Sequence, residues 1–242
     1  MNNVLYITII GVLTGIIGTV GGGFIVIFLK KIKESFLTFI LGISAGIMVV
    51  VVFLDLIPGA LTAGSTLSTI AGMLLGVGLI GLLDFTFPHE HFQGKKINTY
   101  YRVGILLSVG IALHNIPEGL AIGAGYSAAQ SLGLGLAVVI GIHNIPEGIA
   151  VASSLLLAGM SNIKIILITF LAGLPMGLGA FLGALLGNIS PFFLSLALGF
   201  AAGAMLFITF DDLLPTAQEK NKGKLAITGI LLGVFLGILI TG

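Results

Sequence analysis

Long apolar stretches, each almost free of charge, recur from one end of this 242-residue sequence to the other. A helix needs about 20 such residues to cross the hydrocarbon core of a bilayer. Hydrophobic residues make up 57% of the chain and charged residues 8%, whereas a soluble domain carries about 25% charged residues. The chain therefore lacks the polar surface that a soluble fold presents to water, and we expect an all-α membrane protein.

Eight apolar segments, separated by short polar connectors, predict a single membrane domain over residues 1–242. The segments run over about 4–29, 36–57, 67–84, 103–125, 131–158, 163–187, 191–214 and 225–241. No basic residue precedes the first segment, so we interpret it as a span and not as a cleaved signal peptide. The absence of cysteine excludes disulfides and thiolate metal ligands, and the net charge of +1 gives no indication of nucleic-acid binding.

The basic residues predict the orientation of these spans. All 10 Lys and Arg fall in the connectors between spans one and two, three and four, five and six, and seven and eight. These connectors share one side of an eight-span arrangement, and the positive-inside rule makes that side cytoplasmic. We therefore expect a multi-pass protein of the cell (inner) membrane with both termini outside the cytoplasm.

Two internal repeats add to this picture. Residues 41–60 recur at 198–217, at a constant offset of 157 positions, on spans two and seven, which cross in opposite directions. The hexapeptide His-Asn-Ile-Pro-Glu-Gly occurs at 114–119 and again at 143–148, on spans four and five. We expect an inverted repeat of three helices, two central helices and three helices. Transporters often use this plan and bind their substrate near the midplane.

The two hexapeptides carry the chain's clearest candidate site. His114 and Glu118 are four residues apart and share one face of span four, and His143 and Glu147 repeat this arrangement on span five. Two imidazoles and two carboxylates suit zinc and also admit iron(II), manganese and cadmium. Ionisable groups are costly in hydrocarbon unless they are paired or metal-bound. We therefore expect a divalent-metal site near the bilayer centre; a His–Glu hydrogen bond that merely satisfies buried groups is the alternative.

Proline and glycine accompany these candidate ligands. Pro117 and Pro146 cannot donate to the carbonyl groups four residues earlier, so we expect each helix to bend beside its ligands. Gly119 and Gly148 follow directly, and we expect a neighbouring helix to approach closely at both positions.

These features resemble the ZIP (Zrt/Irt-like) family of metal transporters, in particular its short prokaryotic members. The resemblance covers essentially the whole chain and rests on the two hexapeptides, the eight spans, the outward termini and a histidine-bearing cytoplasmic connector. It implies the three-two-three arrangement, import of zinc or related divalent ions, and often a homodimer. It further implies that the four His and Glu side chains form the primary metal site. Asn115 and Asn144 would then face a second, adjacent site that shares the glutamates.

One position departs from the pattern of that family. In many relatives span six carries a Glu-Pro pair, and here Met176 and Gly177 stand where it would be expected. Loss of that carboxylate leaves one tight metal site and at most a weak second one, softened by the methionine thioether.

Three acidic residues mark a candidate pathway for the ion. Asp55 lies near the outer end of span two, and Asp211 and Asp212 lie near the inner end of span seven. These acids could attract cations and help to remove metal-bound water. The equally weighted alternative is that water solvates them at the headgroup boundary.

Other side chains are weaker candidates. Met48 and Met205, which the repeat pairs, either line the pathway as soft contacts or simply pack in the core. The connector between spans three and four offers a candidate cytoplasmic exit site, or a solvated loop, at His89, Glu90 and His91.

Two other functions stay open at this point. A proton-coupled carrier of another substrate would use Glu118 and Glu147 as proton sites, but it would need no paired histidines. An intramembrane metalloenzyme would need a free general base and an open coordination position, as in His-Glu-x-x-His, which is absent. We therefore expect a transporter and not an enzyme. Its partners would be the lipid bilayer and divalent metal ions, which are its substrate and not a cofactor.

Overall fold

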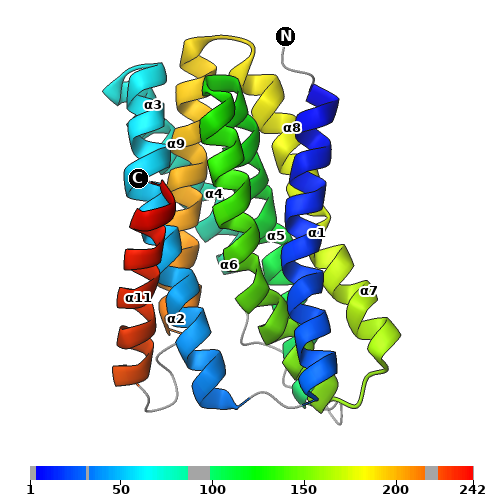
Figure 1. Ribbon diagram of the computed structural model, residues 1–242. Coiled ribbons are helices and arrows are strands. Elements are labelled where there is room, and N and C mark those ends of the chain that lie inside the picture. The colour runs from blue at the N-terminus through cyan, green and yellow to red at the C-terminus, as the bar shows by residue number, and fades with distance from the viewer. Residues whose placement is uncertain (1–3, 31–32, 87–98, 216–222, 242) are drawn as a thin grey trace.

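The computed structural model describes residues 4–30, 33–86, 99–215 and 223–241, and within these ranges the chain forms helices and no strand (Figure 1). Five helices are continuous: α1 (Val4–Leu29), α4 (Thr66–Thr86), α5 (Thr99–Ala128), α6 (Gln130–Leu157) and α11 (Gly223–Thr241). The other spans are composite: α2 (Glu34–Val50), η1 (Val51–Leu56) and α3 (Ile57–Ala63); α7 (Asn162–Gly173) and α8 (Pro175–Gly187); α9 (Pro191–Ile208) and η2 (Thr209–Leu213). The described residues thus form eight helical segments, continuous or composite, and the all-α prediction is confirmed.

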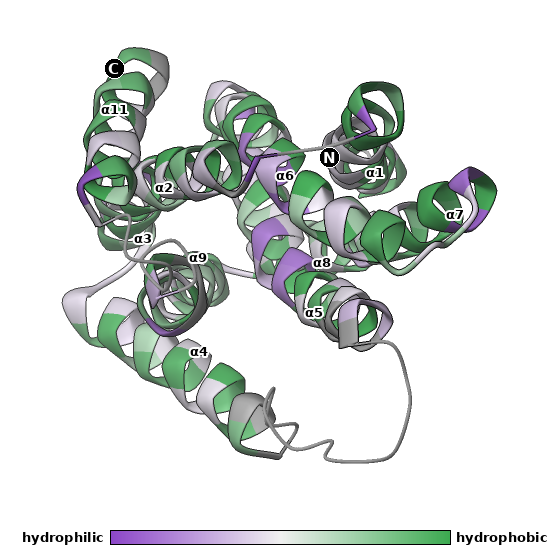
Figure 2. Cartoon of the chain, turned by 90° about the horizontal axis from the view of Figure 1, so that it is seen from below, coloured by the Kyte–Doolittle hydropathy of each residue, from purple (hydrophilic) through white to green (hydrophobic). Residues whose placement is uncertain are grey.

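Large apolar side chains cover much of the surface of the bundle, and the polar side chains of the hexapeptides lie inside it. Five helical segments are long and apolar enough to cross a bilayer: Val4–Leu29, Ser35–Ala63, Gln130–Leu157, Asn162–Gly187 and Pro191–Asp211. Large apolar side chains point outward, among them Phe28 and Ile163, which are 86% and 82% exposed. Figure 2 shows hydrophilic stretches of α5 and α6 inside the bundle. Because this distribution is the reverse of that in a soluble protein, the chain is an integral membrane protein.

Both glycines of the hexapeptides lie at close helix contacts. A Cβ atom added at Gly148 of α6 would overlap the carbonyl oxygen of Thr19 on α1. One added at Gly119 of α5 would overlap the carbonyl oxygen of Met176 on α8. The predicted close approach is therefore confirmed at both positions. The two neighbours, Thr19 and Met176, are separated by the same 157 positions as the repeated segments (19 to 176).

The same offset recurs where the outer helices pack. A Cβ atom on Gly46 of α2 would overlap the carbonyl oxygen of Ile230 on α11, and one on Gly203 of α9 would overlap that of Met73 on α4. The two glycines and their two neighbours are each 157 positions apart (46 to 203, 73 to 230). The contacts of α2 with α11 and of α9 with α4 therefore correspond residue by residue.

The helices divide into two groups by their packing. α1, α5, α6, α7 and α8 pack mainly with one another, and α2, α3, α4, α9 and α11 form the second group. The groups meet where α6 contacts α2 and where α5 contacts α9. The two helices that carry the hexapeptides therefore lie at the boundary between the groups.

A break or a π-helical turn occurs in the second, sixth and seventh spans. α5 and α6 continue through Pro117 and Pro146 without interruption. The sixth span is broken instead at Leu174, directly before Pro175, and the second and seventh spans each contain a π-helical turn, at η1 and η2. These turns were not predicted. They contain Asp55 and the Asp211–Asp212 pair, at corresponding positions of the repeat, and such turns are frequent at functional sites.

Candidate metal site

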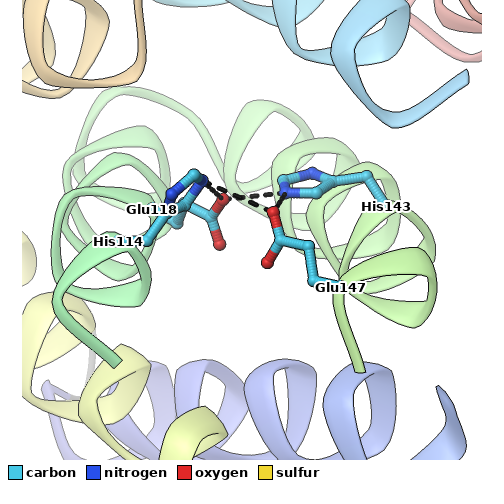
Figure 3. Close-up of side chains that lie close together, drawn as sticks. All are labelled: His114, Glu118, His143 and Glu147. Atoms are coloured by element: carbon cyan, nitrogen blue, oxygen red, sulfur yellow. Dashed lines mark ion pairs between the residues drawn. The ribbon is translucent and has the colours of Figure 1, made fainter. Parts of the chain in front are cut away.

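Four ionisable side chains converge between α5 and α6, two from each helix (Figure 3). The four-residue spacing places His114 beside Glu118 on α5 and His143 beside Glu147 on α6, and the packing of the two helices brings the pairs together. Each residue is at most 4% exposed. One candidate ligand atom from each side chain lies within 4.8 Å of the other three. The structure thus brings together all four residues of the predicted primary site.

The distances between the donor atoms suit a single small cation. Nε2 of His143 lies 2.8 Å from Oε1 of Glu118 and 3.6 Å from Oε1 of Glu147. Nε2 of His114 lies 3.3 Å and 3.5 Å from the same two oxygens. Donors placed about 2.0–2.1 Å from a zinc ion at the corners of a tetrahedron are about 3.3 Å apart. The four distances bracket this value, so the donors need only small shifts to enclose one ion.

Hydrogen bonding within the site is incomplete. Among the described residues, Nε2 of His114, Oε1 of Glu118 and both carboxylate oxygens of Glu147 are buried without a hydrogen-bond partner. His143 Nε2 lies 2.8 Å from Glu118 Oε1, the shortest of the four His–Glu contacts. Buried carboxylates and imidazoles are normally satisfied by a partner. A divalent cation at the point where they converge would satisfy all of them at once.

The asparagines of the hexapeptides form a polar link beside this cluster. Asn115 donates from Nδ2 to the carbonyl oxygen of Ala172 on α7 at 2.8 Å. The Asn144 amide lies between Asn115 and Glu118. Its Nδ2 donates to Oδ1 of Asn115 at 3.0 Å, and exchange of its nitrogen and oxygen would let it donate to Oε2 of Glu118 at 3.2 Å. Both asparagines are fully buried. Asn115 is therefore hydrogen-bonded to the α7 backbone, and Asn144 is hydrogen-bonded to Asn115 or to the candidate ligand Glu118.

The three methionines singled out from the sequence are all fully buried and belong to one apolar cluster. Met176 lies at the start of α8, where its backbone contacts Gly119, and Met48 and Met205 lie on α2 and α9. These positions agree with core packing, the more ordinary of the two interpretations of Met48 and Met205.

Asp55 and Asp211 do not belong to the four-residue cluster. Asp55 is half-buried and lines an open pocket of about 490 Å³ with Leu54, Pro58, Thr62, Leu132 and Leu194. Asp211 is exposed. The side chain of Asp212 and the segment His89–Glu90–His91 lie outside the described residues.

One polar contact of the cluster was not predicted. Ser44 on α2 donates a hydrogen bond of 3.2 Å to the carbonyl oxygen of His143. The sequence did contain a signal, because the repeat has Ala201 at the corresponding position and Ser44 is therefore a polar exception in an apolar segment.

Known proteins resemble this chain over most of its length. The family profile described as ZIP zinc transporter matches residues 86–241. Proteins named zinc transporter ZupT from Chlorobium limicola and Corynebacterium glutamicum are each 37% identical to it, covering 93% of this chain and 91% and 92% of their own. The protein of the same name from Escherichia coli is 35% identical, covering 88% of this chain and 87% of its own.

The profile includes both hexapeptides, and the relatives match nearly all of the helical bundle. Their names describe transporters, so a metal ion is a substrate that passes through the protein and not a resident cofactor. Together with the apolar helical bundle and the buried His–Glu cluster, these matches show that the chain is a membrane transporter of metal ions and belongs to the ZIP family.

Proposed function

We propose that this protein imports zinc into the cytoplasm across the inner membrane, and that the ion binds to His114, Glu118, His143 and Glu147 on its way. The observation that carries this proposal is the convergence of four buried donor side chains. Among the described residues, the facing atoms of three of them, His114, Glu118 and Glu147, lack hydrogen-bond partners. The names of the relatives support zinc as the principal ion. Iron(II), manganese and cadmium are expected competitors, because nitrogen and oxygen donors bind them too.

The proposed arrangement of the spans is three helices, two central helices and three helices, with both termini outside. Its support is that the close glycine contacts recur at an offset of 157 positions. This offset relates α2 to α9 and α4 to α11, and it relates Thr19 of α1 to Met176 of α8. In the same inverted repeat, the two central helices α5 and α6 correspond to each other. The direction of import rests on the basic connectors, which share one side of this arrangement.

Asp55 and Asp211 are proposed to mark the outer and inner ends of the pathway. η1 and η2 belong to oppositely directed spans (Figure 1), so equivalent positions of the repeat lie toward opposite ends of the bundle. The pocket lined by Asp55 would receive the hydrated ion, and the carboxylate would attract it. Asp212 and the His89–His91 segment are further candidates on the cytoplasmic side.

We propose a single tight metal site per chain. A second site beside the first would need the amide oxygens of Asn115 and Asn144 and a further carboxylate. The amide oxygen of Asn115 instead accepts a hydrogen bond from Asn144. Met176 stands where many relatives carry the carboxylate. A thioether is a poor substitute for a carboxylate in binding zinc beside oxygen ligands.

The test is uptake of radioactive zinc into proteoliposomes under an inward gradient. The wild type would be compared with Glu118→Ala and His143→Ala, with cadmium, manganese and iron(II) as competitors. We expect saturable uptake by the wild type and its loss in both variants. Wild-type liposomes that take up no more zinc than empty ones, or variants that match the wild type, would contradict the proposal. The buried carboxylates would then be tested as proton sites.

A further inference from the structure

Ser44 is a buried polar side chain that joins the two helix groups. It is 0% exposed and belongs to α2, in an otherwise apolar stretch. Its hydroxyl donates to the carbonyl oxygen of His143 on α6, at 3.2 Å. The bond therefore runs from the α2 group to the backbone of a candidate metal ligand in the α6 group.

The repeat indicates that helix packing alone does not require this hydroxyl. The position equivalent to Ser44 is Ala201 on α9, which is also 0% exposed, and α9 packs against α5 as α2 packs against α6. His114 on α5 therefore has the same residue type and spacing as His143, but an alanine stands at the position that corresponds to Ser44. Because an alanine fills the equivalent position, the hydroxyl of Ser44 is expected to do more than fill space between the helices.

The ring of His143 lacks the usual restraint of a metal-binding histidine. Such a histidine normally donates the N–H of its second ring nitrogen to an oxygen, which fixes the direction of the ring. The second nitrogen of His143, Nδ1, is enclosed and has no hydrogen-bond partner among the described residues. Figure 3 shows this nitrogen turned away from the carboxylates, which face Nε2. Without that bond, the position of the backbone that carries the ring has a larger share in setting its direction.

The backbone at this point is also weakened by a proline. Pro146 has no N–H, so the carbonyl of Ile142 loses its partner four residues later in α6. His143 follows Ile142 directly, and the bond from Ser44 holds its carbonyl from a neighbouring helix. The hydroxyl thus reinforces the turn from which the ligand projects, at the place where the helix itself holds it least.

We propose that Ser44 is a positioning residue for metal binding, which holds the backbone of His143 so that Nε2 faces the two carboxylates. This inference rests on the proposed metal site. It assigns to α2, which supplies none of the four ligands, a direct effect on the affinity and geometry of the site.

The test is a titration of the purified full-length protein with Co²⁺, whose visible absorption bands report both affinity and ligand geometry. Ser44→Ala removes the hydroxyl. Ser44→Thr and Ser44→Val form a matched pair of nearly equal size, of which only the first keeps a hydroxyl, so the cost of the added atoms is common to both. Ser154→Ala is the control, because this hydroxyl bonds within α6 to the carbonyl of Ala150. Glu118→Ala identifies binding at the site itself.

We expect Ser44→Ala and Ser44→Val to bind Co²⁺ about fivefold more weakly than the wild type, the effect of one lost hydrogen bond, with shifted absorption bands. Ser44→Thr and Ser154→Ala should resemble the wild type. Wild-type affinity and bands in Ser44→Ala would overturn the proposal, and so would a Thr variant no better than the Val variant. If the proposed metal site itself is wrong, the wild type will show no Co²⁺ binding that Glu118→Ala removes. That outcome is distinct from the two results that would overturn the role of Ser44.

Discussion

The two copies of the hexapeptide are identical in sequence and differ in how the rest of the bundle holds them. On α6, His143 is 1% exposed, its Nε2 lies 2.8 Å from a carboxylate oxygen of Glu118, and its carbonyl accepts from Ser44. On α5, His114 is 4% exposed and its nearest carboxylate oxygens are 3.3 Å and 3.5 Å away. The donors come from the repeated motif, whereas residues of other helices determine how firmly each donor is placed.

The neighbours of the two copies differ in a second way. Gly148 contacts the backbone of Thr19, whose hydroxyl can donate to the carbonyl oxygen of either Gly15 or Thr169. Gly119 contacts the backbone at Met176, whose side chain offers no such donor. The backbone packing is therefore the same in the two halves, while the polar contacts around it are not. Four sets of variants test this contrast.

The largest expected effect comes from the carboxylates, which both copies contribute equally. Glu118→Gln and Glu147→Gln each remove a charged oxygen ligand from a buried site. We expect zinc affinity to fall by more than about a hundredfold, because loss of a residue that only supports a ligand already lowers affinity by about ten- to a hundredfold. Calorimetric titration of the purified protein measures this. Asp211→Asn, an exposed acid outside the cluster, should leave affinity unchanged. If either Gln variant keeps wild-type affinity, that glutamate is not a ligand.

The glycines should show the two copies to be alike in packing. Gly148→Ala and Gly119→Ala each force a Cβ atom against a backbone carbonyl, and we expect each to reduce the free energy of unfolding by about 1–3 kcal/mol. Thermal unfolding in detergent measures the change. The control is Gly135→Ala on α6, where nothing lies within 4 Å of the added atom. Equal stability of Gly135→Ala and Gly148→Ala would contradict the described contact.

The histidines should show the two copies to be unequal in binding. His143 is more enclosed and lies closer to its carboxylate, whereas the greater exposure of His114 allows a water molecule to replace its ring more easily. We expect His143→Ala to bind zinc about tenfold more weakly than His114→Ala, since about 1.4 kcal/mol separates affinities by a factor of ten. Competition with a fluorescent zinc chelator measures both. The reverse order would refute the assignment of the α6 copy as the firmer one.

The smallest effect is expected from a new hydroxyl on α9. It would face α5 as the hydroxyl of Ser44 on α2 faces α6. Ala201→Ser places a serine at the position equivalent to Ser44. We expect zinc affinity to rise about twofold, because a hydrogen bond contributes about 0.5–1.5 kcal/mol and the added oxygen must fit a packed position. The same chelator assay measures this gain. A loss of affinity with unchanged thermal stability would show that α9 does not approach the backbone of α5 as α2 approaches that of α6.

Much of the fold and of the candidate site followed from local sequence patterns. The spans depend on composition over about 20 residues, and the ligand pairs depend on a spacing of four residues along one helix. The approach at Gly119 and Gly148 was likewise predictable, since small residues allow helices to pack closely in lipid. Each of these features has a signal in the sequence of a single helix.

The features that were missed depend on contacts between helices. Ser44 reaches His143 across 99 positions of sequence, and only packing of α2 on α6 brings them together. The π-helical turns around Asp55 and Asp211 have no residue signature of their own.

X-ray absorption at the zinc edge of the purified, zinc-loaded protein tests the central claim most directly, because it reports the ligands themselves. Four side chains from the two hexapeptides predict one zinc per chain, with four nitrogen and oxygen neighbours at about 2.0–2.1 Å, two of them showing the multiple scattering of imidazole. Loss of this signal is expected in Glu118→Gln. A sulfur neighbour at about 2.3 Å, a shell of six oxygens, or a spectrum that Glu118→Gln leaves unchanged would contradict the account.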